Sequence, residues 1–431
     1  MRFHIETLGC KVNQYEAQAL GALLRARGHV SASGGEPCDV CVVNTCAVTG
    51  EASRKSRQAV RRLQKSFPGA LVAVAGCLSQ IAPEEIAALG ADLVAGSGDR
   101  RGFIDALERL FAGEQASAEP DDPFSRRVFE PLPADGGERT RAMLKIQDGC
   151  DNFCAYCVIP YARGRVRSLP PESAAAEAKR LASEGFRELV VTGIEISSYG
   201  KDLGDTTLVD VLRAVSAAAD GARLRLGSLE PGSVTPAFCA ALAAIPDLCG
   251  HFHLSLQSGC DETLRRMRRS YGAAAFFEAV TSLRRHFPDC GVTADLITGF
   301  PGETDAEFEE TLAFVEKCAF SDMHVFPFSP RPGTSAADMP GQIEKQVKRA
   351  RAARVRGLAR TMKNAFIDSR RGRVLDVLFE REEDGVSTGH AGNYLEISVP
   401  GTGLRGELLS VRLTGRRGGG IFGELADVRN V

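Results

Sequence analysis

Three cysteines, Cys150, Cys154 and Cys157, lie close together in the segment CDNFCAYC. The segment directly follows Met143–Gln147, a short apolar run that predicts a buried strand. Three thiolates on one loop can bind a single metal centre, and iron–sulfur clusters are commonly held by cysteine thiolates. No fourth cysteine or histidine lies near the loop. Three thiolates would therefore leave one iron of a 4Fe-4S cluster open, as a catalytic metal site requires.

A structural zinc site is the alternative for this loop, with a distant ligand such as Cys260 or a histidine completing it. Structural zinc prefers paired C-x2–4-C hooks and closed four-coordination. The spacing of the loop therefore favours iron over zinc.

A second set of three cysteines, Cys10, Cys46 and Cys77, is scattered in the sequence. Each follows the end of a predicted strand, in TLGC, VVNTC and VAGC. In open α/β sheets, ligand sites lie outside the carboxyl ends of the strands, so the three thiols are expected to meet at one sheet edge. Taken singly, each could be a small buried hydrophobe. The other seven cysteines show no such organisation; they are Cys38, Cys41, Cys239, Cys249, Cys260, Cys290 and Cys318.

The elements that must position the second set alternate between short apolar runs and amphipathic segments. Strands are predicted over Phe3–Leu8, Asp39–Asn44, Ala70–Ala75 and Asp92–Ala95, and helices over Asn13–Arg27, Glu51–Phe67, Pro83–Leu89 and Asp99–Phe111. This alternation predicts an α/β domain with an open parallel sheet over residues 1–112. Residues 113–139, rich in Pro, Asp, Gly and Glu, are expected to form a linker.

Residues 140–368 repeat the same alternation six times. Strands are predicted over Met143–Gln147, Glu188–Thr192, Arg223–Leu229, His251–Leu256, Gly291–Ile297 and Asp322–Phe328. Six βα repeats predict a partial (β/α)6 barrel with its site at the carboxyl ends of the strands. A long basic helix over Gln342–Asp368 follows, and short strands separated by Gly-rich turns predict a small antiparallel β-barrel over residues 369–431.

Composition narrows the class of protein. The 431 residues are enough for about two to four domains, and 44% hydrophobic with 25% charged residues is ordinary for globular proteins. The formal net charge of -2 excludes a globally basic nucleic-acid coat. No apolar run reaches the roughly 18 residues of a membrane helix, and no signal peptide is apparent. We therefore expect a cytoplasmic protein without membrane contact, in which 13 cysteines serve metal binding or catalysis rather than disulfides.

The loop CDNFCAYC after the first strand of a six-repeat β/α region resembles the radical S-adenosylmethionine (SAM) superfamily. The N-terminal domain with three cysteines resembles the methylthiotransferases within it. The segments TLGCKVNQYE, VNTCAVTGEASRKSRQAVRR and IQDGCDNFCAYCVIPYARGRVRS resemble the group that acts on tRNA threonylcarbamoyladenosine. The similarity continues through VTGIEISSYGKDL, LSLQSG, DLITGFPGET and FPFSPRPGT.

The resemblance implies two 4Fe-4S clusters and SAM as cofactors. Cys150, Cys154 and Cys157 would bind the cluster that chelates SAM, and Cys10, Cys46 and Cys77 the cluster that carries the sulfur to be inserted. Further SAM contacts are expected from Tyr156, Gly193, Glu195, Ser228 and Gln257, with Glu195 in place of the amide residue expected at that position. No catalytic residue beyond the cluster ligands is implied.

The implied activity is transfer of a methylthio group to carbon 2 of N6-threonylcarbamoyladenosine, next to the anticodon of tRNA. The implied partners are the tRNA anticodon stem-loop and an electron donor protein; the sulfur source is not indicated. The alternatives within the family are isopentenyladenosine tRNA and a ribosomal-protein aspartate as substrate. A non-catalytic, zinc-stapled RNA-binding protein is the alternative outside it.

Clusters of basic residues are candidates for RNA contact although the net charge of the chain is close to zero. They lie in Arg54–Lys65, at Arg163, Arg165 and Arg167, in Arg265–Arg269, and in Lys345–Arg373. The C-terminal β segment resembles a TRAM domain, a small barrel used for RNA binding. Barrels of this kind grip single strands with basic grooves and a few aromatics, here Tyr394, Phe379 and Phe422. The target base must leave its loop to reach a buried SAM.

Overall fold

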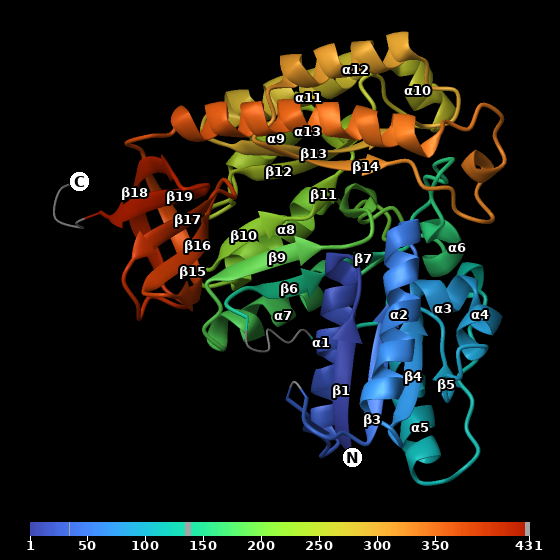
Figure 1. Cartoon of the computed structure of the whole chain (residues 1–431). Helices are drawn as coiled ribbons and strands as arrows, with labels where there is room; N and C mark the ends of the chain where they lie inside the picture. The colour runs from blue at the N-terminus through green and yellow to red at the C-terminus, as the bar shows by residue number, and fades with distance from the viewer. Residues whose placement is uncertain (34, 134–138, 427–431) are drawn as a thin grey trace.

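A computed structural model describes residues 1–33, 35–133 and 139–426. The N-terminal domain is a parallel five-stranded sheet in the order β2-β1-β3-β4-β5, as predicted (Figure 1). The strands are β1 (Arg2–Thr7), β2 (Val30–Ser31), β3 (Val40–Thr45), β4 (Leu71–Gly76) and β5 (Leu93–Val94). The helices are α1 (Lys11–Ala26), α2 (Gly50–Ser66), α3 (Cys77–Ile81), α4 (Pro83–Ala87) and α5 (Arg100–Phe111). Of these elements, β2 and α3 were not predicted; both are too short for a periodic signal.

The register of this sheet brings three strand ends to the same edge. Thr7 of β1 pairs with Asn44 of β3, and Thr45 of β3 pairs with Gly76 of β4. All six residues of β3 are buried, which explains why its sequence is a nearly continuous apolar run. The chain then turns into helices at this edge, with the Thr49 side chain accepting a hydrogen bond from the Ala52 N–H at the start of α2.

The central domain is a partial barrel built from two adjoining parallel sheets, in the orders β10-β9-β6 and β11-β12-β13-β14. Its strands are β6 (Ala142–Lys145), β9 (Glu188–Thr192), β10 (Arg223–Leu226), β11 (Ser228–Leu229), β12 (His251–Gln257), β13 (Gly291–Thr298) and β14 (Asp322–Pro327). The predicted strand Arg223–Leu229 is divided at Gly227, and its halves β10 and β11 belong to different sheets. Since β11 directly follows β10, the two sheets form one curved surface, which confirms the predicted (β/α)6 architecture.

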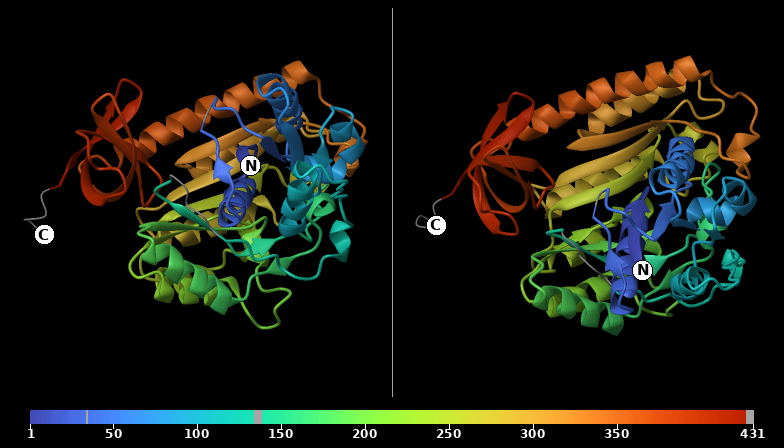
Figure 2. Two further views of the ribbon diagram at one scale, coloured as in Figure 1. Left: turned by 90° about the horizontal axis from the view of Figure 1, so that it is seen from below. Right: turned by 60° about the horizontal axis from the view of Figure 1, so that its bottom comes forward.

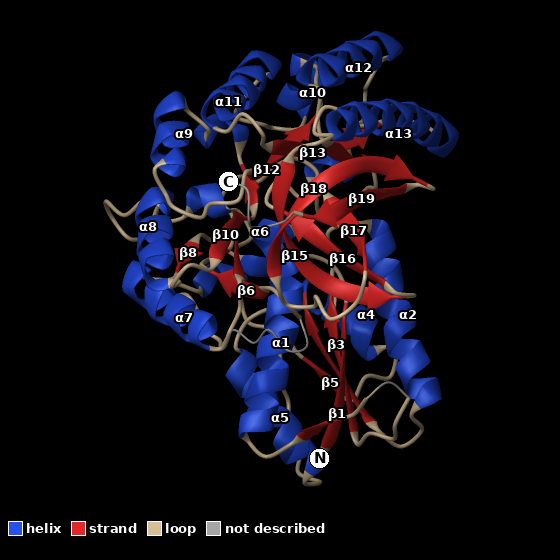
Figure 3. Ribbon diagram, turned by 90° about the vertical axis from the view of Figure 1, so that its left-hand side faces the viewer, coloured by secondary structure: helices blue, strands red, loops and turns tan. Residues whose placement is uncertain are grey.

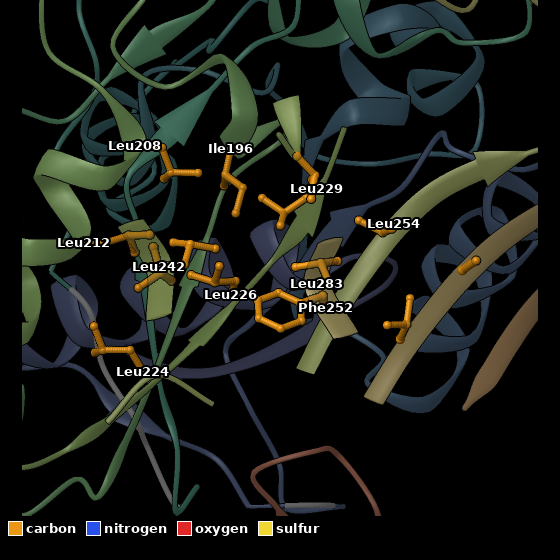
Figure 4. Close-up of a cluster of buried hydrophobic side chains, with 14 of the residues drawn as sticks. Ile196, Leu208, Leu212, Leu224, Leu226, Leu229, Leu242, Phe252, Leu254 and Leu283 are labelled. Atoms are coloured by element: carbon orange, nitrogen blue, oxygen red, sulfur yellow. The ribbon is translucent and has the colours of Figure 1, made fainter. Parts of the chain in front are cut away.

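Helices cover the outer face of the partial barrel. They are α7 (Pro171–Ser183), α8 (Leu208–Ala218), α9 (Pro236–Ala243), α11 (Ala273–His286) and α12 (Asp305–Cys318), with the short α6 (Ile159–Arg163) and α10 (Asp261–Arg266) near the site. Leucines and phenylalanines from the strands pack against these helices in one continuous core, part of which Figure 4 shows. On the other side, α1 of the N-terminal domain contacts β6 (Figure 2).

The two sheets are connected to the C-terminal barrel by α13 (Lys345–Asp368), which crosses the molecule in Figure 1. Strands β15 (Val374–Glu383), β16 (Val386–Ala391), β17 (Glu396–Pro400), β18 (Leu408–Arg417) and β19 (Gly420–Leu425) close into a barrel (Figure 3). All neighbouring pairs are antiparallel except β17 and β19, which close the barrel in parallel through Ser398 and Phe422.

The predicted linker packs against the domains on both sides. Phe129 and Leu132 are buried in the core of the partial barrel, and the Tyr15 hydroxyl of α1 donates a hydrogen bond to the Leu132 carbonyl. Residues 134–138 of this segment lie outside the described residues, as do 427–431 at the end of the C-terminal domain. None of the helices in the described part of the chain is long and apolar enough to cross a membrane.

Candidate active site

The structure brings Cys10, Cys46 and Cys77 to the common edge of β1, β3 and β4. Gly9, with a φ of +99°, lets the Cys10 loop approach Cys46 closely, because a Cβ at this position would lie 2.4 Å from the Cys46 Sγ. Cys46 and Cys77 are buried, whereas Cys10 is exposed. Burial, together with the neighbouring Cys77 and Cys10, raises the pKa of the Cys46 thiol to about 12. A strong Lewis acid such as iron would therefore be needed to hold these groups as thiolates at neutral pH.

Cys150, Cys154 and Cys157 form a second group at the carboxyl end of the barrel strands. The Cys157 N–H donates to the Cys154 carbonyl (3.0 Å), and the Cys150 N–H donates to the Gly164 carbonyl (3.0 Å), so the loop folds back on itself. Burial raises the pKa of the Cys157 thiol to about 12, and the charges of Cys154 and of Cys77 from the other group act in the same direction. The two groups of thiols therefore lie near one another.

The spacing of the sulfurs argues against a mononuclear zinc site. With Zn–S bonds of about 2.3 Å, tetrahedral geometry places two sulfur ligands about 3.8 Å apart. Within the described residues, neither cysteine group has its three sulfurs all within 4.8 Å of one another. All six cysteines are free thiols. Free cysteine thiols in groups of three are the donor type that holds iron–sulfur clusters.

Arg163 connects the two groups. It ends α6, just after the Cys150–Cys157 loop, and its Nε donates to the Cys77 Sγ at 3.2 Å. Its Nη2 donates to Asn13 Oδ1 (2.9 Å) and to Glu16 Oε2 (3.0 Å) on α1. The Arg163 side chain is completely buried.

Glu16 is the centre of this buried network. Lys145 donates to Glu16 Oε1 (2.9 Å) and Arg100 donates to Glu16 Oε2 (2.8 Å). Burial alone would raise the pKa of Glu16, but Arg163, Lys145 and Arg100 together hold that pKa well below its usual range. Glu16 is therefore an anion held by three cations, of which Lys145 and Arg163 join the N-terminal domain to the barrel and Arg100 belongs to the N-terminal domain itself.

Arg269 contacts the other cysteine group. Its Nη1 donates to the Cys154 Sγ (3.0 Å), its Nη2 pairs with Glu230, and its guanidinium lies over the Tyr271 ring at 4.9 Å. The Arg269 side chain is 5% exposed, so its charge acts on the sulfur with little screening by water.

The predicted SAM-contacting residues lie around the same loop. Tyr156 is half-buried, with its ring edge-to-face against Phe300. Gly193 leaves room for Gln147, because a Cβ there would lie 2.8 Å from the Gln147 Oε1. Ser228 begins β11, two residues after β10 ends, and Gln257 is the last residue of β12; neither side chain makes a hydrogen bond to another described residue.

Glu195 has a different environment from these four. Its carboxylate accepts from the Ser197 N–H (3.0 Å) and from the Ser198 hydroxyl, capping the 3-10 turn Ile196–Ser198. Its own N–H donates to Gln147 Oε1 (2.8 Å), and its charge acts on Cys150. The chain itself thus provides some of the hydrogen bonds that the Glu195 carboxylate can accept, and Glu195 lies beside the cysteine loop.

Several residues of the site were not predicted, namely Gln147, Glu16, Asp148, Lys145 and Glu230. Their partners are far apart in the sequence, as with Glu16 and Arg163, and no local spacing marks such a pair. The one available signal is a charged residue inside an apolar helical pattern, which Glu16 displays in NQYEAQAL.

Part of the predicted basic surface is buried instead. Arg163 and Arg167 pair with Asp148, and only Arg165 of that trio is exposed. On α2, arginines 54, 57 and 62 pair with acidic residues from other turns or elements. The prediction that Phe379 contacts RNA is wrong, because its side chain is fully buried in the C-terminal barrel. Period-2 alternation placed Phe379 in a strand without showing which face it occupies.

A polar groove of about 960 Å³ lies between α13 and the C-terminal barrel. Its lining includes the cationic side chains of Arg360, Lys363, Arg371, Arg416 and Arg417. Tyr394 lies at the same place and stacks on His251 of the partial barrel, with ring centroids 4.5 Å apart. Lys363 pairs with Asp322 and Arg416 pairs with Asp368 in the same groove. Arg360, Arg371 and Arg417 have no ion-pair partner among the described residues, so the groove is one part of the predicted basic surface that remains open to a polyanion.

Comparison with known proteins agrees with this geometry. The family described as "Radical SAM superfamily" matches residues 144–315, and "Uncharacterized protein family UPF0004" matches residues 2–96. The chain is 36% identical over 420 residues to "Threonylcarbamoyladenosine tRNA methylthiotransferase MtaB" of Bacillus subtilis, which covers 95% of this chain and 93% of the relative. The relative of the same name from Thermotoga maritima is 36% identical and covers 98% of this chain and 97% of its own.

A relative with a different name is "tRNA-2-methylthio-N(6)-dimethylallyladenosine synthase" of Moorella thermoacetica. It is 34% identical, and the match covers 99% of this chain and 98% of the relative's length. Among solved structures, the radical SAM methyltransferase TsrM of Kitasatospora setae with cobalamin and a 4Fe-4S cluster has a TM-score of 0.58 at 15% identity. That match covers 78% of this chain and 74% of TsrM and shows a shared fold. With relatives matched along nearly its whole length, this chain belongs to the radical SAM methylthiotransferase family.

Proposed function

We propose that this protein transfers a methylthio group to carbon 2 of N6-threonylcarbamoyladenosine in the anticodon loop of tRNA. The relatives that carry this name support the substrate. The observation that carries the proposal is the meeting of two three-thiol groups, with Arg163 of one loop bound to Cys77 of the other. A methylthiotransferase needs two such sites side by side, because radical generation and sulfur delivery are separate tasks at one substrate carbon.

In this proposal Cys150, Cys154 and Cys157 hold the 4Fe-4S cluster that binds SAM, and Cys10, Cys46 and Cys77 hold the second. The domain division follows: residues 1–112 for sulfur delivery, 140–368 for radical generation and 369–431 for RNA binding. When bound, SAM and the clusters supply the radical, the sulfur and the methyl group. The target C–H bond is neither acidic nor electrophilic, so side-chain acid–base chemistry offers no route to it.

The protein's own residues then have three tasks. Arg163 and the Glu16 network fix one cysteine group relative to the other. Tyr156, Gly193, Glu195, Ser228 and Gln257 are the candidates for holding SAM. The burial of Cys46 and Cys77 keeps water from that part of the site, which protects a reactive radical from side reactions.

RNA binding is assigned to the groove between α13 and the C-terminal barrel. Its cations and Tyr394 suit a splayed RNA loop, which is recognised by phosphate contacts and stacking. The anticodon stem-loop and an electron donor protein are the partners that the proposal requires.

An isopentenyladenosine tRNA is the second candidate substrate, because a dimethylallyladenosine synthase matches 99% of this chain. Mass spectrometry of tRNA nucleosides from a deletion strain separates the two. Loss of methylthio-threonylcarbamoyladenosine supports the proposal, whereas loss of the methylthio-isopentenyl nucleoside alone assigns the second substrate.

Complementing that strain with Cys10→Ala and with Cys150→Ala tests the division of labour. We expect neither variant to restore the product. Purified Cys10→Ala should still cleave SAM in part, and purified Cys150→Ala should not. A normal product level with Cys10→Ala would contradict a sulfur-delivering role for this group.

A further inference from the structure

A cationic pocket of about 400 Å³ lies between the start of α1, the inner face of the partial barrel and the C-terminal barrel. The described residues that line it include Lys11, Arg139, Arg141, Arg225 and Arg381, against Glu380 as the only carboxylate. A pocket with this imbalance attracts an anion.

Most of these cations already have partners. Arg225 donates to Glu188 Oε1 (2.6 Å), Arg141 donates to Glu380 (3.0 Å) and Arg381 pairs with Glu396. Lys11 differs from them: its half-buried ammonium makes no hydrogen bond or ion pair with any residue in the described ranges. A half-buried ammonium without an acceptor costs free energy that a bound anion would recover.

Within residues 1–33, 35–133 and 139–426, no free carboxylate lies near Lys11. The charged groups that act on its ammonium are Arg225, Arg141, Glu188 and Asp295. Glu188 is already bound by Arg223 and Arg225, on both of its oxygens.

Asp295 is occupied in the same way. One of its oxygens lies 3.2 Å from the His253 Nε2, and the other lies 3.2 Å from the His324 Nδ1. An anion bound in the pocket would therefore give Lys11 the acceptor that the described residues do not supply.

We propose that Lys11 binds the carboxylate of the threonylcarbamoyl group on the substrate adenosine. The inference rests on the proposed function. Lys11 directly follows Cys10, which belongs to the thiol group assigned to sulfur delivery, so carbon 2 of the base must approach this position.

The shape of the base then brings its side chain to the pocket. Carbon 2 and carbon 6 of adenine flank the same ring nitrogen, and the N6 substituent leaves from carbon 6 along that edge. A base with carbon 2 toward Cys10 thus places its N6 group within reach of the four-carbon Lys11 side chain. An isopentenyl group has no acceptor for an ammonium, so the contact would also give specificity.

The test compares two anticodon stem-loops, one with threonylcarbamoyladenosine and one with its methyl ester, which lacks the negative charge. Both are measured with the cluster-loaded protein, by fluorescence anisotropy for Kd and by mass spectrometry for kcat/KM. The variants are Lys11→Gln, Lys11→Arg and, as a matched control, Lys179→Gln, an exposed lysine on the outer helix α7. Iron content checks that each variant is folded and loaded.

We expect Lys11→Gln to weaken binding of the acid stem-loop by about tenfold or more, since it removes one partner of a charge pair. The same variant should change binding of the ester by less than about twofold. Lys11→Arg should restore most of the affinity for the acid, and Lys179→Gln should match the wild type.

Equal losses for acid and ester in Lys11→Gln, or a wild type that does not distinguish them, would overturn the inference. Failure of the proposed function has a different signature. Wild type would then bind the acid stem-loop in a Lys11-dependent manner and yet form no methylthio product.

Discussion

The Arg163 guanidinium donates a hydrogen bond to the Cys77 sulfur, although the two residues belong to different domains. Cys77 is part of the N-terminal cysteine group, whereas Arg163 follows the Cys150–Cys157 group in the chain. The same side chain bonds to Asn13 and Glu16 on α1, so one buried arginine holds three residues of the first domain. Because Arg163 ends the short helix after the Cys150–Cys157 loop, any shift of one group is transmitted to the other. The relative placement of the two thiol groups is thus set by a charge network, not by apolar packing alone.

Replacing Arg163 by Met should be strongly destabilising. The change leaves Glu16 with fewer cations in a buried site, and breaking a buried ion pair from one side costs about 3–5 kcal/mol. Guanidinium denaturation of the purified protein should show a lower midpoint. Arg165→Met is the matched control, because Arg165 is exposed and its ion pair with Asp151 and its contacts with the Phe124 and Phe153 rings lie at the surface, so its midpoint should stay near that of the wild type.

Replacing Arg269 by Gln should lower the reduction potential of the cluster held by the Cys150–Cys157 loop. Arg269 donates to the Cys154 sulfur from a nearly dry site, and such hydrogen bonds and positive charges favour the reduced, more negative state. Potentiometric titration followed by electron paramagnetic resonance measures the shift. The adjacent Arg268 is exposed, and Arg268→Gln should leave the potential where it is; equal shifts in both variants would remove the special role of Arg269.

Acid should loosen the attachment of the C-terminal barrel through Glu188. Burial alone would raise the pKa of this carboxyl, but Arg225, Arg223 and Arg141 lower it from 4.5 to about 2. Since the folded-state pKa is depressed, this contribution to stability is present in full above about pH 4.5 and is lost as the pH falls toward 2. Over that window the loss is of the order of 3 kcal/mol.

Arg223 and Arg225 also donate to backbone carbonyls of the C-terminal barrel, at His390 and Gly392. Loss of their ion pairs with Glu188 should therefore weaken the contact between the partial barrel and the C-terminal barrel and expose the strands of the C-terminal barrel to solvent. Hydrogen exchange of β15 and β16 at decreasing pH measures the effect. In Glu188→Gln the exchange should be fast already at pH 7, with a weaker pH dependence. Glu172→Gln, at an exposed position on α7, is the control; an unchanged profile in Glu188→Gln would refute the mechanism.

Binding of tRNA should depend steeply on salt, because phosphate contacts release counterions. Arg360 and Arg417 are exposed, line the groove between α13 and the C-terminal barrel, and have no ion-pair partner among the described residues. Replacing both by Gln should reduce the slope of log K against log salt by about 1 to 2. Lys179→Gln, outside the groove, should leave the slope unchanged, and a flat salt response of the wild type would count against the groove.

The sequence alone determined most of the elements and their order, with short elements such as β2 and α3 as exceptions. Periods of two and 3.6 residues located the barrel strands and helices, and the strand-end positions of Cys10, Cys46 and Cys77 predicted that they share one sheet edge. These features depend only on the spacing of residues that are close together in the sequence.

The tertiary structure decided which charges face water and which join domains. Arg163 and Arg165 are two residues apart in the sequence, yet one is fully buried against Cys77 and Glu16 and the other is exposed. Likewise Lys11 and Lys145 are both lysines, but in the part of the chain that the structure describes only Lys145 meets a carboxylate from another domain. Charge pairing depends on distances between remote segments and on the water that packing removes, and no local pattern encodes either of these.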